Sequence, residues 1–448
     1  MADKLESLTA ALLDAAKKAG ATAADAMAVD GTAISVDVRQ NRLEQAERAE
    51  GVEIGLRVLI GQRQASVSAS DISARTIADM AERAVAMARE APADDGVGLA
   101  DPDQLATTWD AEALELSDPS AEPNAAALEA DARRAEAAAL GVTGISQVDS
   151  ASASYARRRI HIAMSNGFSG GYSRSSRAIS AVAITGEGLL MERDWAAESR
   201  VFQADLPPAE DIGLLAAERT LARAGARQPK TGAYPVIFDE RIASGLIGHI
   251  LSAVNGGAIV RGASWLRDAL GTQILPKGLS IFEDPHRPRL SGSRPFDAEG
   301  LATRPRHIVE DGVLKGWTLD LTTARRLGMA STASAVRGTS GPPSPSNANI
   351  ALTQGSQTRD QLVADMGTGL LVTSFLGASI NSTTGDYSRG ASGFWVENGQ
   401  IAYAVNECTI AGNLRDMARA IIPANDARLH LSYVVPSLLV EGLTLAGQ

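Results

Sequence analysis

His249 carries the most versatile chemistry in this sequence, because an imidazole can bind a metal or transfer a proton near neutral pH. It lies at the edge of the apolar face of a predicted helix, and no second histidine or carboxylate stands beside it at zinc-ligand spacing. One imidazole cannot hold zinc alone. The residues favour a histidine packed in or against the core, with a relic metal ligand and a substrate contact as alternatives. The remaining histidines are scattered without helical pairing: His161, His286, His307 and His430.

A second group of functional side chains stands in a glycine-rich segment, residues 385–393 (GDYSRGASG). It combines a carboxylate, a phenol, a hydroxyl and a guanidinium, on Asp386, Tyr387, Ser388 and Arg389. Glycines would let backbone N–H groups approach a ligand, and an arginine can bind a carboxylate. We predict a loop that either lines a substrate cleft or is a structural turn in which Asp386 and Arg389 pair. The segment has no G-K-[ST] motif, so nucleotide binding is not predicted.

The single cysteine, Cys408, follows Glu407 in the segment NECTIAG. A nucleophilic cysteine needs a nearby base and a lowered thiol pKa. No histidine stands close in sequence, and the charge of Glu407 would raise the pKa of the thiol. A small buried hydrophobic residue is therefore the better interpretation of Cys408.

His249 depends for its position on a central strand and helix, residues 235–257 (PVIFDERIASGLIGHILSAVNGG). The first four residues predict an apolar strand, Asp239 can cap a helix running to about Val254, and two glycines end it. Aliphatic residues cover roughly half of the helix surface: Ile242, Leu246, Ile247, Ile250, Leu251 and Val254. Ser244, Gly248 and Ser252 form a small face, where we expect another backbone to approach closely. The pattern predicts a helix buried in the middle of a domain.

Four segments, beginning at Leu246, Gly292, Gly385 and Glu407, resemble the TldD/PmbA family. They are LIGHILSAVNGGAIVRGASWL, GSRPFDAEGLATRPRHIVEDGVLKGW, GDYSRGASGFWVENGQIAY and ECTIAGNLRDM. The resemblance covers most of the chain and is strongest from residue 232 to residue 414. Members of this family are linked to metallopeptidase activity.

In the TldD branch of the family, a helix like the central one carries the motif H-E-x-x-x-H. The resemblance places its second histidine on His249, and its first histidine and glutamate on Ser244 and Gly245. Serine and glycine can neither hold Zn²⁺ nor activate its water. A further cysteine ligand of the TldD branch has no counterpart in residues 428–437. The resemblance thus implies the TldE/PmbA branch, with no metal and no cofactor bound by this chain.

Length and composition narrow the class of protein. With 448 residues we expect two domains. A net charge of -11 argues against nucleic acid as a partner, and one cysteine fits a reducing compartment. No apolar stretch approaches the roughly 20 residues that span a membrane, and no signal peptide is evident, so we expect a cytoplasmic protein.

The predicted fold class is α+β. An N-terminal α+β domain of helices and antiparallel strands (1–226) would precede a β-rich C-terminal domain (232–448) that holds the central buried helix and the peptidase-like framework. The order helix, strands, helix recurs in the first half and predicts a doubled unit. In the second half, Asp311-Gly312 and Asn398-Gly399 predict type I′ hairpin turns. Residues 338–347 (GTSGPPSPSN) predict a surface loop, and Thr409 is predicted to cap a helix to Ile421.

Three functions remain open at this point. The resemblance implies a non-catalytic subunit that joins a TldD-type metallopeptidase as a heterodimer, with zinc in the partner and small or unfolded polypeptides as substrates, including peptide-antibiotic precursors and antitoxins. A homodimer is the alternative assembly when the partner is absent. The second hypothesis is an autonomous peptidase that uses separated residues such as His249, Asp386 and Glu407, or Cys408. The third is a peptide-binding module without catalysis.

Overall fold

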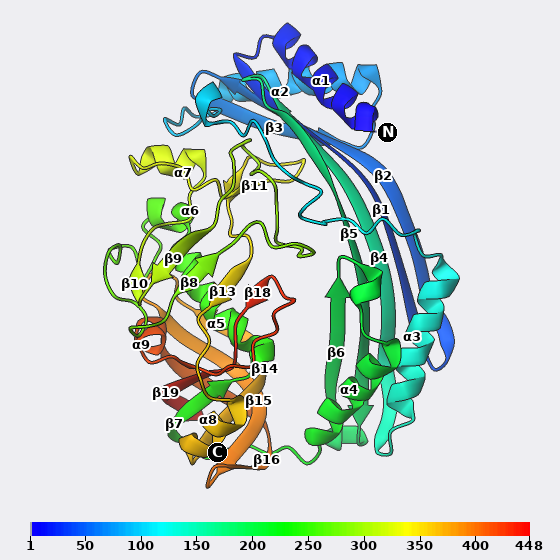
Figure 1. The fold of residues 1–448 in the computed structure, drawn as a ribbon, viewed down its shortest axis with the longest axis vertical. Coiled ribbons are helices and arrows are strands. Elements are labelled where there is room, and N and C mark those ends of the chain that lie inside the picture. The colour runs from blue at the N-terminus through cyan, green and yellow to red at the C-terminus, as the bar shows by residue number, and fades with distance from the viewer. Residues whose placement is uncertain (1) are drawn as a thin grey trace.

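The structure of the chain, a computed structural model, describes residues 2–448. It confirms the α+β class: one large sheet with helices forms the N-terminal part, and smaller sheets surround a central helix in the C-terminal part (Figure 1). Within the described residues, no helix is both long and apolar enough to cross a membrane.

The N-terminal part is a six-stranded antiparallel sheet in the order β3-β2-β1-β4-β5-β6. Its strands are β1 (Ala23–Arg39), β2 (Arg42–Ile60), β3 (Arg63–Ala69), β4 (Ile145–Met164), β5 (Ser169–Thr185) and β6 (Glu192–Arg200). Its helices are α1 (Ala2–Ala19), α2 (Ala74–Glu90), α3 (Ala125–Leu140) and α4 (Ala209–Ala222). Along the chain, the order helix, three strands, helix occurs twice.

Separate apolar clusters hold the two pairs of helices to this sheet. α1 and α2 pack on β1–β3 through residues such as Leu12 and Met80, and α3 and α4 pack on the neighbouring strands through residues such as Leu128 and Ile212. In Figure 1 the sheet forms a curved wall, with α1 and α2 near one end and α3 and α4 near the other.

The C-terminal part contains a six-stranded sheet in the order β16-β15-β14-β7-β19-β17, which closes on itself because β16 also pairs with β19. Its strands are β7 (Gly232–Phe238), β14 (Gly369–Ile380), β15 (Asp386–Glu397), β16 (Gln400–Asn413), β17 (Ile422–Pro423) and β19 (Leu438–Ala446). A five-stranded sheet follows the order β10-β9-β8-β13-β18, with β8 (Ile281–Glu283), β9 (Arg306–Glu310), β10 (Val313–Leu314), β13 (Ile350–Leu352) and β18 (Tyr433–Val434). The short strands β11 (Ala335–Val336) and β12 (Ser344–Pro345) form a separate pair.

The central helix is α5 (Glu240–Ala253), and its apolar face is buried as predicted. Asp239 caps it by accepting a hydrogen bond from the backbone N–H of Arg241. Leu246, Ile247 and Ile250 join one apolar cluster with residues of both C-terminal sheets. The other helices of this part are α6 (Gly256–Val260), α7 (Leu321–Arg326), α8 (Arg359–Met366) and α9 (Leu414–Arg419).

Both predicted hairpins are present, with Asp311 and Gly312 between β9 and β10, and Asn398 and Gly399 between β15 and β16. All four residues have positive φ angles, as a type I′ turn requires. The predicted cap at Thr409 is wrong. Thr409 lies in β16, whose two edges are both paired there, so the strand continues and Asn413 caps α9 instead.

Buried charges join the N-terminal sheet to the C-terminal part. Asp25 on β1 accepts a hydrogen bond from Arg57 Nε on β2 at 2.6 Å, and its other oxygen pairs with Arg337, which follows β11. All three side chains are shielded from solvent. Beside them the backbone of Thr339 approaches β2 so closely that a Cβ at Gly55 would lie 2.1 Å from its carbonyl oxygen. The start of the 338–347 loop is thereby fixed on the N-terminal sheet.

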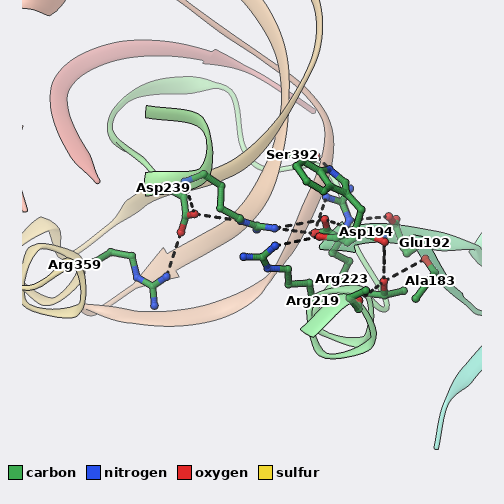
Figure 2. A network of polar contacts seen from close by, with 12 residues as sticks. Ala183, Glu192, Asp194, Arg219, Arg223, Asp239, Arg359 and Ser392 are labelled. Carbon is green, nitrogen blue, oxygen red and sulfur yellow. Dashed lines mark hydrogen bonds and ion pairs between the residues drawn. The ribbon is translucent and has the colours of Figure 1, made fainter. Parts of the chain in front are cut away.

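A second polar network joins the same two parts at α5 (Figure 2). Arg241, in the first turn of α5, lies 3.4 Å from Asp194 on β6 and 3.2 Å from Asp239. Arg359 of α8 reaches Asp239 from the other side at 3.1 Å. The N-terminus of the central helix is thus tied to an edge strand of the N-terminal sheet.

Three buried acids lie next to the first charge cluster. Glu299 Oε2 accepts the backbone N–H of Leu321 at 2.8 Å, while its Oε1 has no hydrogen-bond partner. Burial and the charges of Asp297 and Asp320 raise the pKa of Glu299 well above its usual value. Burial also raises the pKa of Asp297 to about 6. Folding therefore favours the protonated forms of Glu299 and Asp297.

Removing the carboxylate of Asp25 should lower the free energy of unfolding. Asp25→Ala leaves Arg57 and Arg337 buried without their counter-charge, and we expect a loss of about 3–5 kcal/mol in the free energy of unfolding. Urea denaturation would measure it. Asp79→Ala, which removes an exposed partner of Arg75, is the control and should change stability by less than about 0.5 kcal/mol. Equal effects of the two changes would contradict a structural role for the buried cluster.

Glu299→Gln should become relatively more stabilising as pH rises. The folded-state pKa of Glu299 lies above its unfolded value, so the stability of the wild type is lost as pH rises through that range, whereas glutamine does not titrate. We expect the difference in Tm between variant and wild type to be more positive at pH 8 than at pH 5, as measured by calorimetry. The exposed Glu82→Gln is the control. A difference independent of pH would show that Glu299 is ionised in the folded protein.

Candidate functional site

The small face of α5 lines a groove of about 410 Å³. One wall is formed by Ser244, Gly245, Gly248, Leu251, Ser252 and Asn255, and the other by Pro345, Ser346, Asn347 and Tyr433. The expectation of a closely packed backbone on this face is wrong, because a Cβ at Gly245 or Gly248 would meet nothing within 4 Å. The end of the 338–347 loop stands away from the helix and leaves the space open.

Hydrogen bonds hold the outer wall in place. The side chain of Asn255 donates to the carbonyl of Pro345 at 2.8 Å, and that of Asn347 donates to Thr318 Oγ1 at 2.9 Å. Arg294 Nη2 donates to the carbonyl of Ser346 at 2.8 Å. Both ends of the 338–347 loop are therefore anchored, one to the N-terminal sheet and one beside α5.

His249 lies on α5 beside the groove-lining residues and packs against β15. Its ring meets that of Tyr387 edge to face, with 5.8 Å between ring centroids. Burial, together with the positive charge of Arg389, lowers the pKa of His249 below its usual value. Burial raises the pKa of the Tyr387 hydroxyl. Both side chains are thus held in their neutral forms near neutral pH.

Residues 385–393 are not the predicted loop, since all but the first belong to β15. The glycines serve strand pairing: a Cβ at Gly393 would lie 1.9 Å from the carbonyl oxygen of Leu371, and one at Gly390 would lie 2.6 Å from that of Leu376. Both carbonyls belong to β14, which could not approach so closely if these positions carried side chains. Glycine here signals a close strand contact and not a turn.

The strand separates the four predicted site residues into two groups. Alternate side chains of a strand point to opposite faces, so Tyr387 and Arg389 share the face toward His249, and Asp386 and Ser388 lie on the other. The guanidinium of Arg389 stacks 4.2 Å above the ring of Phe375 and donates to the carbonyl of Gly377. Asp386 instead accepts hydrogen bonds from Thr384 at 2.6 Å and Asn413 at 3.2 Å. The structure therefore brings together only His249, Tyr387 and Arg389.

Cys408 is buried on β16, as the sequence indicated, and its Sγ donates to the carbonyl of Ala391 at 3.2 Å. Burial raises the pKa of the thiol to about 11, so the nucleophilic thiolate is disfavoured. Glu407 has a positive φ angle and accepts a hydrogen bond from Gln228. Neither residue has the surroundings of a catalytic nucleophile or base.

The other histidines stay apart in space as they do in sequence. His161 is hydrogen-bonded to Thr9 and His286 to Thr303, while His307 and His430 each lie near a glutamate. Within residues 2–448, no three side chains of the His, Cys, Asp or Glu types are grouped so that they could hold a metal ion.

The groove does not fit a zinc ion. Ser244 offers a hydroxyl and Gly245 no side chain, where a metallopeptidase needs an imidazole and a carboxylate. His249 is not among the residues that line the groove, and the nearby charge of Arg389 disfavours a cation beside its ring. The residues that line the groove therefore do not include groups that activate water.

Family models match nearly the whole chain in three consecutive parts. They describe domain 1 of the PmbA/TldA metallopeptidases over residues 24–88, the central domain over residues 118–224 and the C-terminal domain over residues 231–447. The chain belongs to the TldD/PmbA family.

Full-length relatives support this family membership. Metalloprotease PmbA of Escherichia coli O157:H7 is 37% identical over 93% of this chain and 90% of its own length. A PmbA homologue of Haemophilus influenzae is 36% identical over 97% and 94% of the two chains. Among solved structures, a Bacteroides thetaiotaomicron protein described as a DNA gyrase modulator has a TM-score of 0.91 at 28% identity, covering 100% and 99% of the chains. TldE of Thermococcus kodakarensis shares the fold, with a TM-score of 0.85 at 19% identity over 98% and 100%.

The sequence did not identify the residues of the outer wall as part of a site. Pro345, Ser346 and Asn347 belong to the segment that its prolines and serines marked as a surface loop, and loops often carry function. That signal could have raised interest in the segment, but it does not reveal that the loop lies over α5. Tyr433, about ninety residues further on, gave no signal at all.

Gly248→Ala should test whether the groove face is open. Because the new Cβ meets nothing, we expect the better helix propensity of alanine to add about 0.5–1 kcal/mol to the free energy of unfolding. Gly256→Ala is the matched comparison, since its Cβ would lie 2.6 Å from Thr323 Oγ1 and should destabilise the protein. Urea denaturation measures both. Comparable destabilisation by the two changes would show that the small face is packed.

Proposed function

We propose that this chain is the metal-free, non-catalytic subunit of a cytoplasmic two-chain metallopeptidase, in which a TldD-type partner supplies zinc. The observation that carries the proposal is the groove on α5, which presents Ser244 and Gly245 where the family resemblance expects a ligand and a catalytic carboxylate. A chain that has the groove but lacks the reactive groups is best explained as a subunit whose partner carries out the catalysis.

The groove suits an extended peptide better than a compact ligand. Its inner wall of glycines and serines leaves room for backbone and side chains, and its outer wall is held by hydrogen bonds. We propose that the chain helps enclose small or unfolded polypeptides, such as peptide-antibiotic precursors or antitoxins, and keeps the partner in its active form. A stable heterodimer would bury well over about 1,000 Å². A homodimer forms only when the partner is absent.

The geometry weighs against the autonomous peptidase. Asp386 lies on the opposite face of β15 from Tyr387 and His249, and burial raises the thiol pKa of Cys408. Hydrolysis needs an activated nucleophile and stabilisation of a developing oxyanion, and these residues do not form such a unit. The peptide-binding module remains the alternative, because a groove alone would serve it equally well.

Reconstitution would distinguish these functions. The purified chain should contain no stoichiometric zinc and should not cleave unfolded peptides, whereas mixing with an H-E-x-x-x-H subunit of the same genome should give one complex with chelator-sensitive activity. Size-exclusion chromatography with light scattering, metal analysis and mass spectrometry of the products provide the measurements. Activity of the chain alone that follows it through successive columns would refute the non-catalytic role. Failure to bind the TldD-type chain would favour the peptide-binding module.

Two variants sharpen this experiment. Gly248→Leu should fill the groove and reduce peptide cleavage by the complex without unfolding the chain, while Gly51→Leu on the exposed part of β2 should not. Restoring histidine and glutamate at Ser244 and Gly245 should not confer activity on the isolated chain, because the remaining ligand and its supporting groups are missing.

A further inference from the structure

A second pocket, of about 240 Å³, lies beyond the C-terminal end of α5. It is formed by the segment that follows α6, by two residues of α9 and by Thr383 in the turn between β14 and β15. Ser264 connects the pocket to α5, because its hydroxyl donates to the carbonyl of Ala253 at 2.6 Å. No residue of this pocket lines the groove.

The charged side chains that line this pocket are mostly positive. Three arginines line it, Arg267, Arg415 and Arg419, against one carboxylate, Asp268, which lies 3.4 Å from Arg267. The chain as a whole has a net charge of -11. A local excess of two positive charges favours an anion at this place, although the protein as a whole is acidic.

The two arginines of α9 are arranged so that an anion would stabilise them. Arg415 and Arg419 are one helical turn apart, a spacing at which like charges repel each other. Arg415 donates to the carbonyl of Trp265, which orients its guanidinium and leaves further N–H groups for a ligand. The side chain of Arg419 makes no hydrogen bond or ion pair with any residue from 2 to 448. Asp416 lies between them in sequence but does not line the pocket.

Two hydroxyl groups of the pocket are already engaged. Ser264 Oγ donates to a carbonyl and accepts the backbone N–H of Leu266, and Thr272 Oγ1 donates to the carbonyl of Ala269. The guanidinium groups are the charged donors that remain available. Their planar forks match the two oxygens of a carboxylate or two oxygens of a phosphate.

We propose that this pocket binds an oxyanion, a carboxylate or a phosphate, through Arg267, Arg415 and Arg419. The two sources to be distinguished are the C-terminal carboxylate of a short peptide and free inorganic phosphate. The proposal does not rest on the function proposed above, because the pocket and the groove share no residue.

Isothermal titration calorimetry of the full chain tests the proposal with three probes: sodium phosphate, trialanine and trialanine amide. Ionic strength is kept constant with sodium chloride. Saturable binding of one equivalent of phosphate, or of trialanine but not its amide, is the expected result and identifies the source. Arg419→Ala should weaken binding about tenfold or more, and Arg419→Lys should weaken it less. Arg75→Ala, on α2 far from the pocket in sequence, should bind as the wild type does.

Two outcomes would overturn the proposal. One is the absence of saturable binding by either anion, and the other is equal binding by wild type and Arg419→Ala. Arg419 has no partner to lose within the described residues, so its removal should leave the melting temperature unchanged. Arg267→Ala gives a second, independent variant on another segment, and it should weaken the same probe.

Discussion

The burial of one face of α5 is the constraint on which the candidate site depends. Leu246, Ile247 and Ile250 are packed between the two C-terminal sheets, and each such side chain contributes roughly 1.5–3 kcal/mol by leaving water. The helix therefore cannot turn about its axis. Because its orientation is fixed, Ser244, Gly245 and Gly248 must face the groove, and the residue types at these positions decide what chemistry the groove can offer.

The buried charges between the two parts of the chain hold the segment that forms the other wall of that groove. Arg337 is paired with Asp25 inside the molecule, and a few residues later Pro345, Ser346 and Asn347 stand opposite α5. One continuous segment thus connects the N-terminal sheet to the groove. These charges can be buried because they are paired with one another. The position of the segment therefore depends on how the two parts of the chain are joined.

The surroundings of His249 agree with a role other than metal binding. The positive charge of Arg389 and the neutral ring of Tyr387 are its neighbours, where a metal ligand would be oriented by a carboxylate or a carbonyl. The residues that line the groove beside it do not include the imidazole and carboxylate that a metallopeptidase uses. This chemistry of the groove is the basis of the proposed partnership.

The sequence determined the features that depend on neighbours along the chain. Residues a few positions apart predict the apolar face of α5, its cap at Asp239 and the two type I′ turns. The structure contains each of these features. The absence of a motif histidine and glutamate at Ser244 and Gly245 was equally visible in the sequence. Only the tertiary structure decided that the small face of α5 is open, because Gly248 and Pro345 are distant in sequence and no local pattern relates them. It also decided that residues 386–393 form a strand, since the glycines that suggested a loop are required by the backbone of β14, which only the assembled sheet brings alongside.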